Sequence, residues 1–202
     1  MNIHTNTPTL PALETANADF VTPFLAVGGD LSYDDDMAVR QTVELVVHGG
    51  ITHVLDVRHE ANDTEWWADT EVTYLWAGID DAGQRVPAAW FDRIVTWATD
   101  AIAAGGVVLT HCHMGINRGP SAGYAVLLGL GWDPVEALSA IRAVRPIAHI
   151  WYAEDALRWH FDRVGASPVQ RRTTLARVAQ WREENPLDVV RIIRGIRASE
   201  GH

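Results

Sequence analysis

The order of the apolar segments limits the fold of this chain more than any other feature. Before residue 112, short apolar runs of the length of buried strands alternate with longer segments of helical spacing. After residue 118 the pattern is helical throughout. Strands that alternate with helices predict an α/β fold with a central, mainly parallel twisted sheet flanked by helices. The apolar runs are Phe24–Val27, Thr52–Val57, Val72–Trp76 and Val107–His111.

The helical segments divide the chain into a domain and a tail. Residues 1–19 show no periodicity and are expected to form a flexible leader, whereas residues 20–164 are expected to form the domain. Residues 165–202 are expected to add a basic extension, with helix starts at Ser167-Pro168 and Asn185-Pro186. Earlier helices are predicted at about Met37–His48, 88–104, Gly119–Leu130, Asp133–Val144 and Tyr152–Val164.

The only cysteine, Cys112, lies where the last predicted strand meets the start of a helix. The amides and the dipole at a helix amino terminus favour an anion, and therefore the thiolate form of this cysteine. Arg118, in the first turn of the helix, can hold two oxygens of a phosphate with its planar guanidinium. Gly115 can adopt a positive φ, which lets successive amides turn inward around an anion. The segment therefore predicts a phosphate site beside a nucleophilic thiol.

This segment resembles the signature of the cysteine-dependent protein phosphatases, which is His-Cys, five residues and then Arg, and it is most similar to the dual-specificity branch. Gly50–Val57 resembles an early core strand of that family, and Val144-Arg145-Pro146 resembles the Arg-Pro that follows the helix after the loop. The resemblance covers about residues 20–164. It implies Cys112 as the nucleophile, Arg118 as the phosphate clamp and residues 113–118 as an amide cradle. That cradle consists of His113, Met114, Gly115, Ile116, Asn117 and Arg118.

The resemblance also implies a proton donor and supporting residues. The family places an acidic residue on a loop about thirty residues before the cysteine, which favours Asp81 over Asp80 as the general acid. His111 is expected to bond the loop backbone and support the thiolate. The family has Ser or Thr directly after the arginine, but this chain has Gly119, and the nearest hydroxyl is that of Ser121. This departure predicts slow hydrolysis of a phosphocysteine intermediate.

Composition excludes several other classes of function. The net charge of −10 disfavours nucleic acid and anionic membranes as partners, and one cysteine can form neither an internal disulfide nor a Cys-rich zinc site. His111, Cys112 and His113 alternate in direction and cannot easily converge on one metal ion, so neither metal nor cofactor is expected. No apolar stretch approaches about 20 residues, so we expect a cytoplasmic protein. The apolar stripe of residues 189–196 predicts packing on the domain or a homodimer.

These features predict a phosphatase that hydrolyses phosphotyrosine and phosphoserine or phosphothreonine in proteins through a phosphocysteine. The enzymatic alternative is a phosphoinositide or RNA 5′-phosphate phosphatase. The loop has no Lys and the domain is acidic, which makes densely anionic substrates less favourable. Two other classes stay open, namely a phosphate-binding module with weak catalysis and a redox sensor built on the lone thiol.

Overall fold

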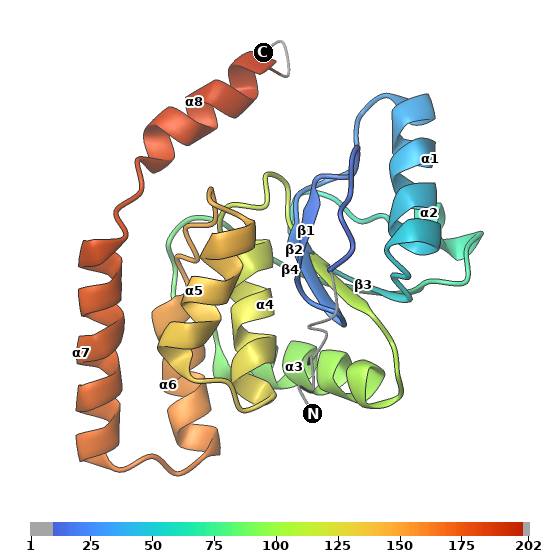
Figure 1. Cartoon of the computed structure of the whole chain (residues 1–202). Helices are drawn as coiled ribbons and strands as arrows, with labels where there is room; N and C mark the ends of the chain where they lie inside the picture. The colour runs from blue at the N-terminus through green and yellow to red at the C-terminus, as the bar shows by residue number, and fades with distance from the viewer. Residues whose placement is uncertain (1–9, 200–202) are drawn as a thin grey trace, which may run out of the picture.

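The computed structural model describes residues 10–199. Within this range, one five-stranded sheet has the strand order β1-β2-β5-β3-β4 (Figure 1). Strand β1 is antiparallel to β2, and the remaining neighbours are parallel. The mainly parallel α/β fold predicted from the sequence is therefore confirmed. The strands are β1 (Ala18–Thr22), β2 (Leu25–Gly28), β3 (His53–Arg58), β4 (Thr73–Ile79) and β5 (Val108–His111).

The helices follow the predicted order with small shifts at their ends, except that the helix start predicted at Asn185-Pro186 is wrong: Asn185 ends α7, and the last helix begins at Val189. Asp133 caps α5 with its side chain and Ser167 caps α7, as expected of residues whose oxygens accept from the first free amides. The helices are α1 (Asp35–Val43), α2 (Thr64–Ala68), α3 (Ala88–Ala103), α4 (Arg118–Gly129), α5 (Pro134–Val144), α6 (Ala153–Arg163), α7 (Pro168–Glu184) and α8 (Val189–Ser199). A π-helical turn, η1 (Glu44–His48), continues α1.

Two elements, β1 and α2, were not predicted from the sequence. Strand β1 includes residues 18 and 19, which were expected to belong to the flexible leader. Strand β1 begins at Ala18, and the segment before it is held by the Glu44 carboxylate, which accepts hydrogen bonds from the amides of Glu14, Thr15 and Ala16. Residues 14–19 are thus packed on the domain, while residues 1–9 lie outside the described part. The second element is α2, a single short helix that buries Trp67.

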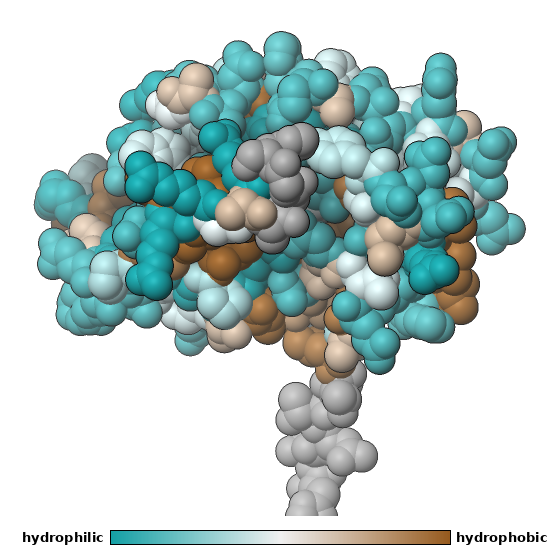
Figure 2. Space-filling view, turned by 90° about the horizontal axis from the view of Figure 1, so that it is seen from above, coloured by the Kyte–Doolittle hydropathy of each residue, from teal (hydrophilic) through white to brown (hydrophobic). Residues whose placement is uncertain are grey.

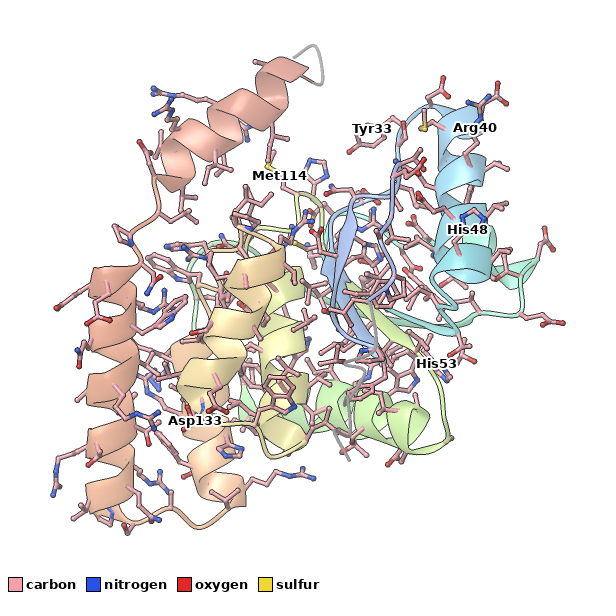
Figure 3. The ribbon with its side chains drawn as sticks, viewed as in Figure 1. Tyr33, Arg40, His48, His53, Met114 and Asp133 are labelled. Carbon is pink, nitrogen blue, oxygen red and sulfur yellow. The ribbon has the colours of Figure 1, made fainter. Side chains whose placement is uncertain are left out.

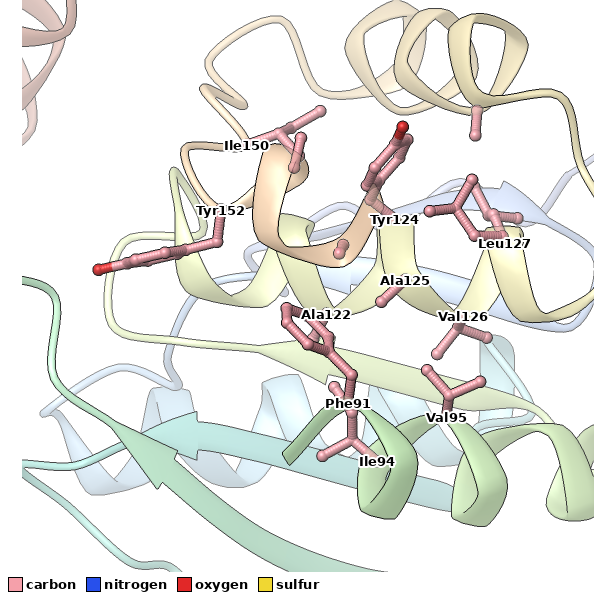
Figure 4. Packing of buried hydrophobic residues seen from close by; sticks show 14 of the residues in the cluster. Phe91, Ile94, Val95, Ala122, Tyr124, Ala125, Val126, Leu127, Ile150 and Tyr152 are labelled. Atoms are coloured by element: carbon pink, nitrogen blue, oxygen red, sulfur yellow. The ribbon is translucent and has the colours of Figure 1, made fainter. Parts of the chain in front are cut away.

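Helices cover both faces of the sheet (Figure 1). Successive strand residues point to opposite faces, so Val54 belongs to the core under η1 and α2, whereas Leu55 belongs to the core on the other face. This second core is the larger one, and helices α3 and α4 meet within it, where Val95 faces Val126 and Phe91 lies beside Ala122 (Figure 4). Because β5 lies between β2 and β3 and is fully buried, its carboxyl end is held rigidly from both sides.

The two helices of the C-terminal extension differ in how they pack. Val178 and Trp181 of α7 are buried in the larger core, and the Trp181 indole donates to Ser139 Oγ of α5 at 2.9 Å. Helix α8 has no fully buried side chain within residues 189–198, and it projects past the carboxyl end of the sheet (Figure 1). None of the helices in the described part is long and apolar enough to cross a membrane.

Candidate active site

The loop from Cys112 to Asn117 joins the central strand β5 to helix α4. It lies at the carboxyl end of a parallel sheet, which is where α/β proteins of this kind bind ligands. Cys112 is buried, with 2% of its surface exposed, and its amide donates to the Gly28 carbonyl of the neighbouring strand at 3.3 Å. The sequence therefore predicted correctly that the thiol stands between a buried strand and a helix.

The backbone of this loop presents its amides to the interior of the loop. The carbonyls of residues 113–116 all accept hydrogen bonds from the surrounding protein. The His113 carbonyl accepts from the Asp30 amide at 2.8 Å, and the Ile116 carbonyl accepts from the His149 amide at 2.8 Å. The carbonyls of residues 114 and 115 accept from the Arg145 guanidinium. In a trans peptide the N–H points opposite to the carbonyl. The amides of residues 114–117, which bond no other described residue, therefore face inward as an anion nest.

Arg145 fixes the shape of the loop from outside. Its Nε donates to the Gly115 carbonyl at 2.6 Å and its Nη2 to the Met114 carbonyl at 3.1 Å. The same guanidinium bonds Asp19 and Asn17, so it ties the loop to the first strand. Gly115 has φ +64°, and a Cβ there would lie 2.2 Å from Arg145 Nη2. The loop thus needs glycine at this position, as the sequence predicted.

Arg118 is buried and is oriented by a carboxylate. Its Nη1 and Nη2 donate to the two oxygens of Glu60 at 2.6 and 2.5 Å, and Nη1 also donates to the Ile79 carbonyl at 3.0 Å. A guanidinium has five N–H groups, so these bonds leave the Nε–H and one Nη2–H. These two groups form a second, parallel fork, and Nε is buried without a hydrogen bond. Arg118 therefore has the edge needed to bind two phosphate oxygens.

The ion pair with Arg118 holds Glu60 in its charged form. Its hydrogen bonds from the guanidinium lower the pKa of Glu60 to about 2, although partial burial acts in the opposite direction. Glu60 follows directly after the end of β3, so the sheet itself brings this carboxylate to the loop. The ionised pair therefore persists throughout the pH range of ordinary assays.

The structure separates the two candidate acids. Asp81 lines the same pocket as Cys112, and its Oδ2 lies 3.6 Å from Arg118 Nε. Asp80 is largely exposed and points instead to His59, with 3.2 Å between Oδ1 and Nδ1. Of the two, Asp81 is therefore the carboxylate that lies in the Cys112 pocket, and its role as the general acid stays a prediction.

Tyr152 positions the Asp81 loop. Its hydroxyl donates to Asp81 Oδ1 at 3.1 Å and accepts from the Gly83 amide at 3.3 Å. Burial raises the pKa of Tyr152 to about 12, and the neighbouring Asp81 acts in the same direction. The hydroxyl therefore keeps its proton and can hold the carboxyl group in the pocket.

The prediction that His111 bonds the loop backbone is wrong, because its ring makes no hydrogen bond to a described residue. His111 Nε2 makes no hydrogen bond and lies 3.8 Å from Asp56 Oδ1, and burial lowers the pKa of this imidazole. Ser121 Oγ accepts from the Tyr152 amide at 3.2 Å, so it serves the packing of α6. A Cβ on Gly119 would lie 2.9 Å from Cys112 N and from His111 C. Helix α4 therefore approaches the strand too closely for a larger residue without a shift.

The pocket above Cys112 has a volume of about 170 Å³. Residues of the loop, of the Asp81 segment and of α8 line it: Asp81, Cys112, His113, Met114, Ile116, Asn117, Arg118, Ile193 and Arg197. Among the described residues, no group of three or more His, Cys, Asp or Glu side chains is placed to hold a metal ion. The arrangement presents amides, a guanidinium edge and a thiol to one small anion.

Sequence reasoning named the loop and Asp81 but missed Glu60 and Tyr152 altogether, and for Arg145 it gave no role. Glu60 and Arg118 are 58 residues apart, and Tyr152 and Asp81 are 71 apart. Glu60 had one usable signal, because polar residues just after parallel strands meet at the same edge of a sheet. Tyr152 had none, since a tyrosine at a helix start is ordinary.

The fold is that of the cysteine-dependent dual-specificity phosphatases, which confirms the fold that the sequence resemblance implied. No family model matches the sequence, and no curated protein does. Among solved structures, PTPMT1 in complex with PI(5)P is 21% identical, with a TM-score of 0.64 over 74% of this chain and 97% of that chain. Tk-PTP in its active form is 22% identical (TM-score 0.61, 73% and 97% covered), and human DUSP28 is 18% identical (TM-score 0.62, 74% and 99% covered).

Proposed function

We propose that this chain is a phosphatase that hydrolyses phosphomonoesters in two steps. In the first, the Cys112 thiolate attacks phosphorus, and the bond from phosphorus to the ester oxygen breaks as Asp81 donates a proton to that oxygen. In the second, water attacks phosphorus, Asp81 takes up its proton, and the sulfur–phosphorus bond breaks to release phosphate. Arg118 and the loop amides stabilise the equatorial oxygens in both steps.

One observation carries this proposal. The Nε–Nη2 edge of Arg118 and the inward amides of residues 114–117 converge on a pocket that also holds Cys112 and Asp81. The buried Arg118 Nε makes no hydrogen bond, since the Asp81 carboxylate lies 3.6 Å away, and an unmade bond at a buried guanidinium next to an amide nest favours an anionic ligand. A module that only bound phosphate would need neither the thiol nor a carboxyl group in the same pocket.

The substrates that we propose are phosphoproteins, with the cytoplasm as the compartment because it keeps a lone thiol reduced. The likeness to PTPMT1 bound to PI(5)P supports a phosphoinositide as the alternative. Carboxylates of Asp30, Asp35 and Asp63 line the pocket of about 400 Å³ next to the loop, and the arginine that lines it, Arg58, is already paired with Asp30 and Asp63. They disfavour a ring that carries several phosphates.

The test is the release of p-nitrophenol from p-nitrophenyl phosphate in the presence of a chelator. We expect activity in the wild type, no activity in Cys112→Ser, and a fall of about 100-fold in Asp81→Asn when an alkyl phosphate with a poor leaving group replaces the aryl ester. Asp80→Asn should fall by less than Asp81→Asn. A wild type that binds phosphopeptide without turnover would contradict the proposal and favour a binding module.

A further inference from the structure

Helix α8 contributes two side chains to the active-site pocket, although sequence places it some eighty residues after the loop. Ile193 and Arg197 line the same pocket as Cys112. Figure 3 shows Met114 of the loop directly below α8. Figure 2, which looks down on this end of the molecule, shows hydrophobic surface beside hydrophilic surface in the region of α8. The pocket is therefore completed by a helix from outside the catalytic loops.

The two faces of α8 explain its placement. Ile192, Ile193 and Ile196 form a half-buried stripe, while Arg191 and Arg194 are exposed on the opposite side. Arg197 follows Ile193 by four residues, so both side chains lie on the edge of the helix that borders the pocket. The helix thus brings one apolar and one cationic side chain to the mouth of the site.

The Arg197 guanidinium has no protein partner there. It is exposed, and it makes no ion pair or hydrogen bond with any described residue. By contrast, the guanidinium groups of Arg58, Arg118 and Arg145 are all bonded to carboxylates. A cation that lines a phosphate pocket without a counterion is available to an anionic group on the ligand.

We propose that α8 is part of the substrate site and that Arg197 selects phosphotyrosine peptides with an acidic side chain beside the phosphorylated residue. Ile193 covers the aromatic ring of that residue, and Arg197 pairs with the flanking carboxylate. This inference rests on the proposed function, because it takes the phosphoryl group to bind at the Cys112 loop. It adds a specificity-determining residue that belongs to none of the catalytic loops.

The charges around the pocket favour a single flanking carboxylate over a polyphosphate. On the side of His113, the neighbouring pocket carries Asp30, Asp35 and Asp63, and the arginine that lines it, Arg58, is already paired with Asp30 and Asp63, so this side offers no free guanidinium to an anion. Only the α8 side offers an unpaired cation among the described residues that line the active-site pocket. A peptide can place one acidic residue on that side and keep its other flank neutral or basic, whereas a ring with several phosphates cannot.

The experiment measures peptide binding to the Cys112→Ser protein, so that it does not depend on turnover. Two pairs of fluorescent phosphotyrosine peptides are compared, with Asp or Asn on the amino-terminal side in one pair and on the carboxyl-terminal side in the other. In at least one pair, the Asp peptide should bind about two- to fivefold more tightly, as expected of an exposed ion pair, and the preference should fall with added salt. Arg197→Gln in the same background should remove the preference.

Arg194→Gln is the matched control, because it makes the same change on α8 at a position outside the pocket, and it should keep the preference. Equal binding of Asp and Asn peptides, or an equal loss in Arg194→Gln and Arg197→Gln, would overturn the inference. So would binding of a soluble inositol bisphosphate that depends on Arg197 without any peptide preference, which would assign α8 to phosphoinositides. Wild-type hydrolysis of p-nitrophenyl phosphate, measured separately, tells whether the proposed function itself stands.

Discussion

The ion pair between Glu60 and Arg118 shows how one carboxylate can prepare a guanidinium for another anion. Glu60 occupies one edge of Arg118 and leaves the other edge for phosphate. Since the Glu60 side chain is 49% exposed, it contributes more to the orientation of Arg118 than to the core. We therefore expect Glu60 to act as a positioning residue for Arg118.

We expect Glu60→Gln to lower kcat/KM for p-nitrophenyl phosphate by about ten- to a hundredfold, because a guanidinium that is no longer held can miss its position by an ångström. The melting temperature should change little. Glu65→Gln, an equal loss of charge at an exposed position of α2, is the control and should keep wild-type kinetics. Wild-type kcat/KM in Glu60→Gln would show that Arg118 keeps its position without the Glu60 carboxylate.

Gly119 gives a second prediction at this scale. The family resemblance suggests that a hydroxyl is missing here, but the structure adds that a Cβ would lie 2.9 Å from Cys112 N. We expect Gly119→Ala and Gly119→Ser both to destabilise the fold by about 1–3 kcal/mol, as overpacking does, and to lower turnover. Urea unfolding and burst kinetics measure the two effects. If the hydroxyl matters as well, Gly119→Ser will hydrolyse its phosphocysteine faster than Gly119→Ala, and wild-type stability of both variants would refute the packing argument.

At the scale of elements, the turn η1 carries a pH-dependent link to the segment before β1. Glu44 is buried and accepts hydrogen bonds from the amides of Glu14, Thr15 and Ala16. Burial alone would raise the pKa of Glu44, but these hydrogen bonds prevail and lower it to about 2. Because the folded pKa lies below that of the unfolded chain, the stabilisation is complete above about pH 4.5 and is lost as the pH falls toward 2.

We therefore expect the wild-type melting temperature to fall between pH 5 and pH 2.5 more steeply than that of Glu44→Gln. Thermal unfolding followed by circular dichroism across this range measures both slopes. Glu71→Gln, the same substitution at an exposed position, should keep the wild-type slope. Identical slopes in wild type and Glu44→Gln would mean that this carboxylate does not link η1 to the chain before β1.

Local patterns predicted most elements, and their failures have physical causes. The runs that became β2 to β5 are apolar because both faces of a parallel sheet are covered. Strand β1 escaped prediction because it is an edge strand of five residues interrupted by Asp19. Within the site, the loop was predictable because Cys112 and Arg118 are close in sequence. The contacts of Glu60, Arg145 and Tyr152 exist only once distant elements pack together.

At the scale of the whole molecule, α7 belongs to the packed domain and α8 does not. Trp181 is buried in the larger core, and Arg182 donates to the Ile150 carbonyl at 2.8 Å. Truncation after Gly165 should therefore cost at least about 3–5 kcal/mol, the usual cost of removing one buried tryptophan. Truncation after Asn185 should leave the free energy of unfolding nearly unchanged.

Urea titration of the two truncated proteins beside the full chain measures this difference. Sedimentation of the same three proteins also tests the homodimer, which should disappear with α8 if the apolar stripe of that helix joins two copies. Equal stability of both truncated proteins would show that α7 is dispensable for the domain.

Arg145 makes the shape of the loop from Cys112 to Asn117 depend on residues far apart in the chain. Its guanidinium joins the loop carbonyls to Asp19, which lies 126 residues earlier in the chain. Chains emerge from the ribosome amino terminus first, so Cys112 leaves the exit tunnel before Arg145 does. A nascent chain in that interval carries Cys112, the proposed nucleophile, without the residue that shapes the loop around it. The loop can thus take its final shape only after synthesis of the domain is nearly finished.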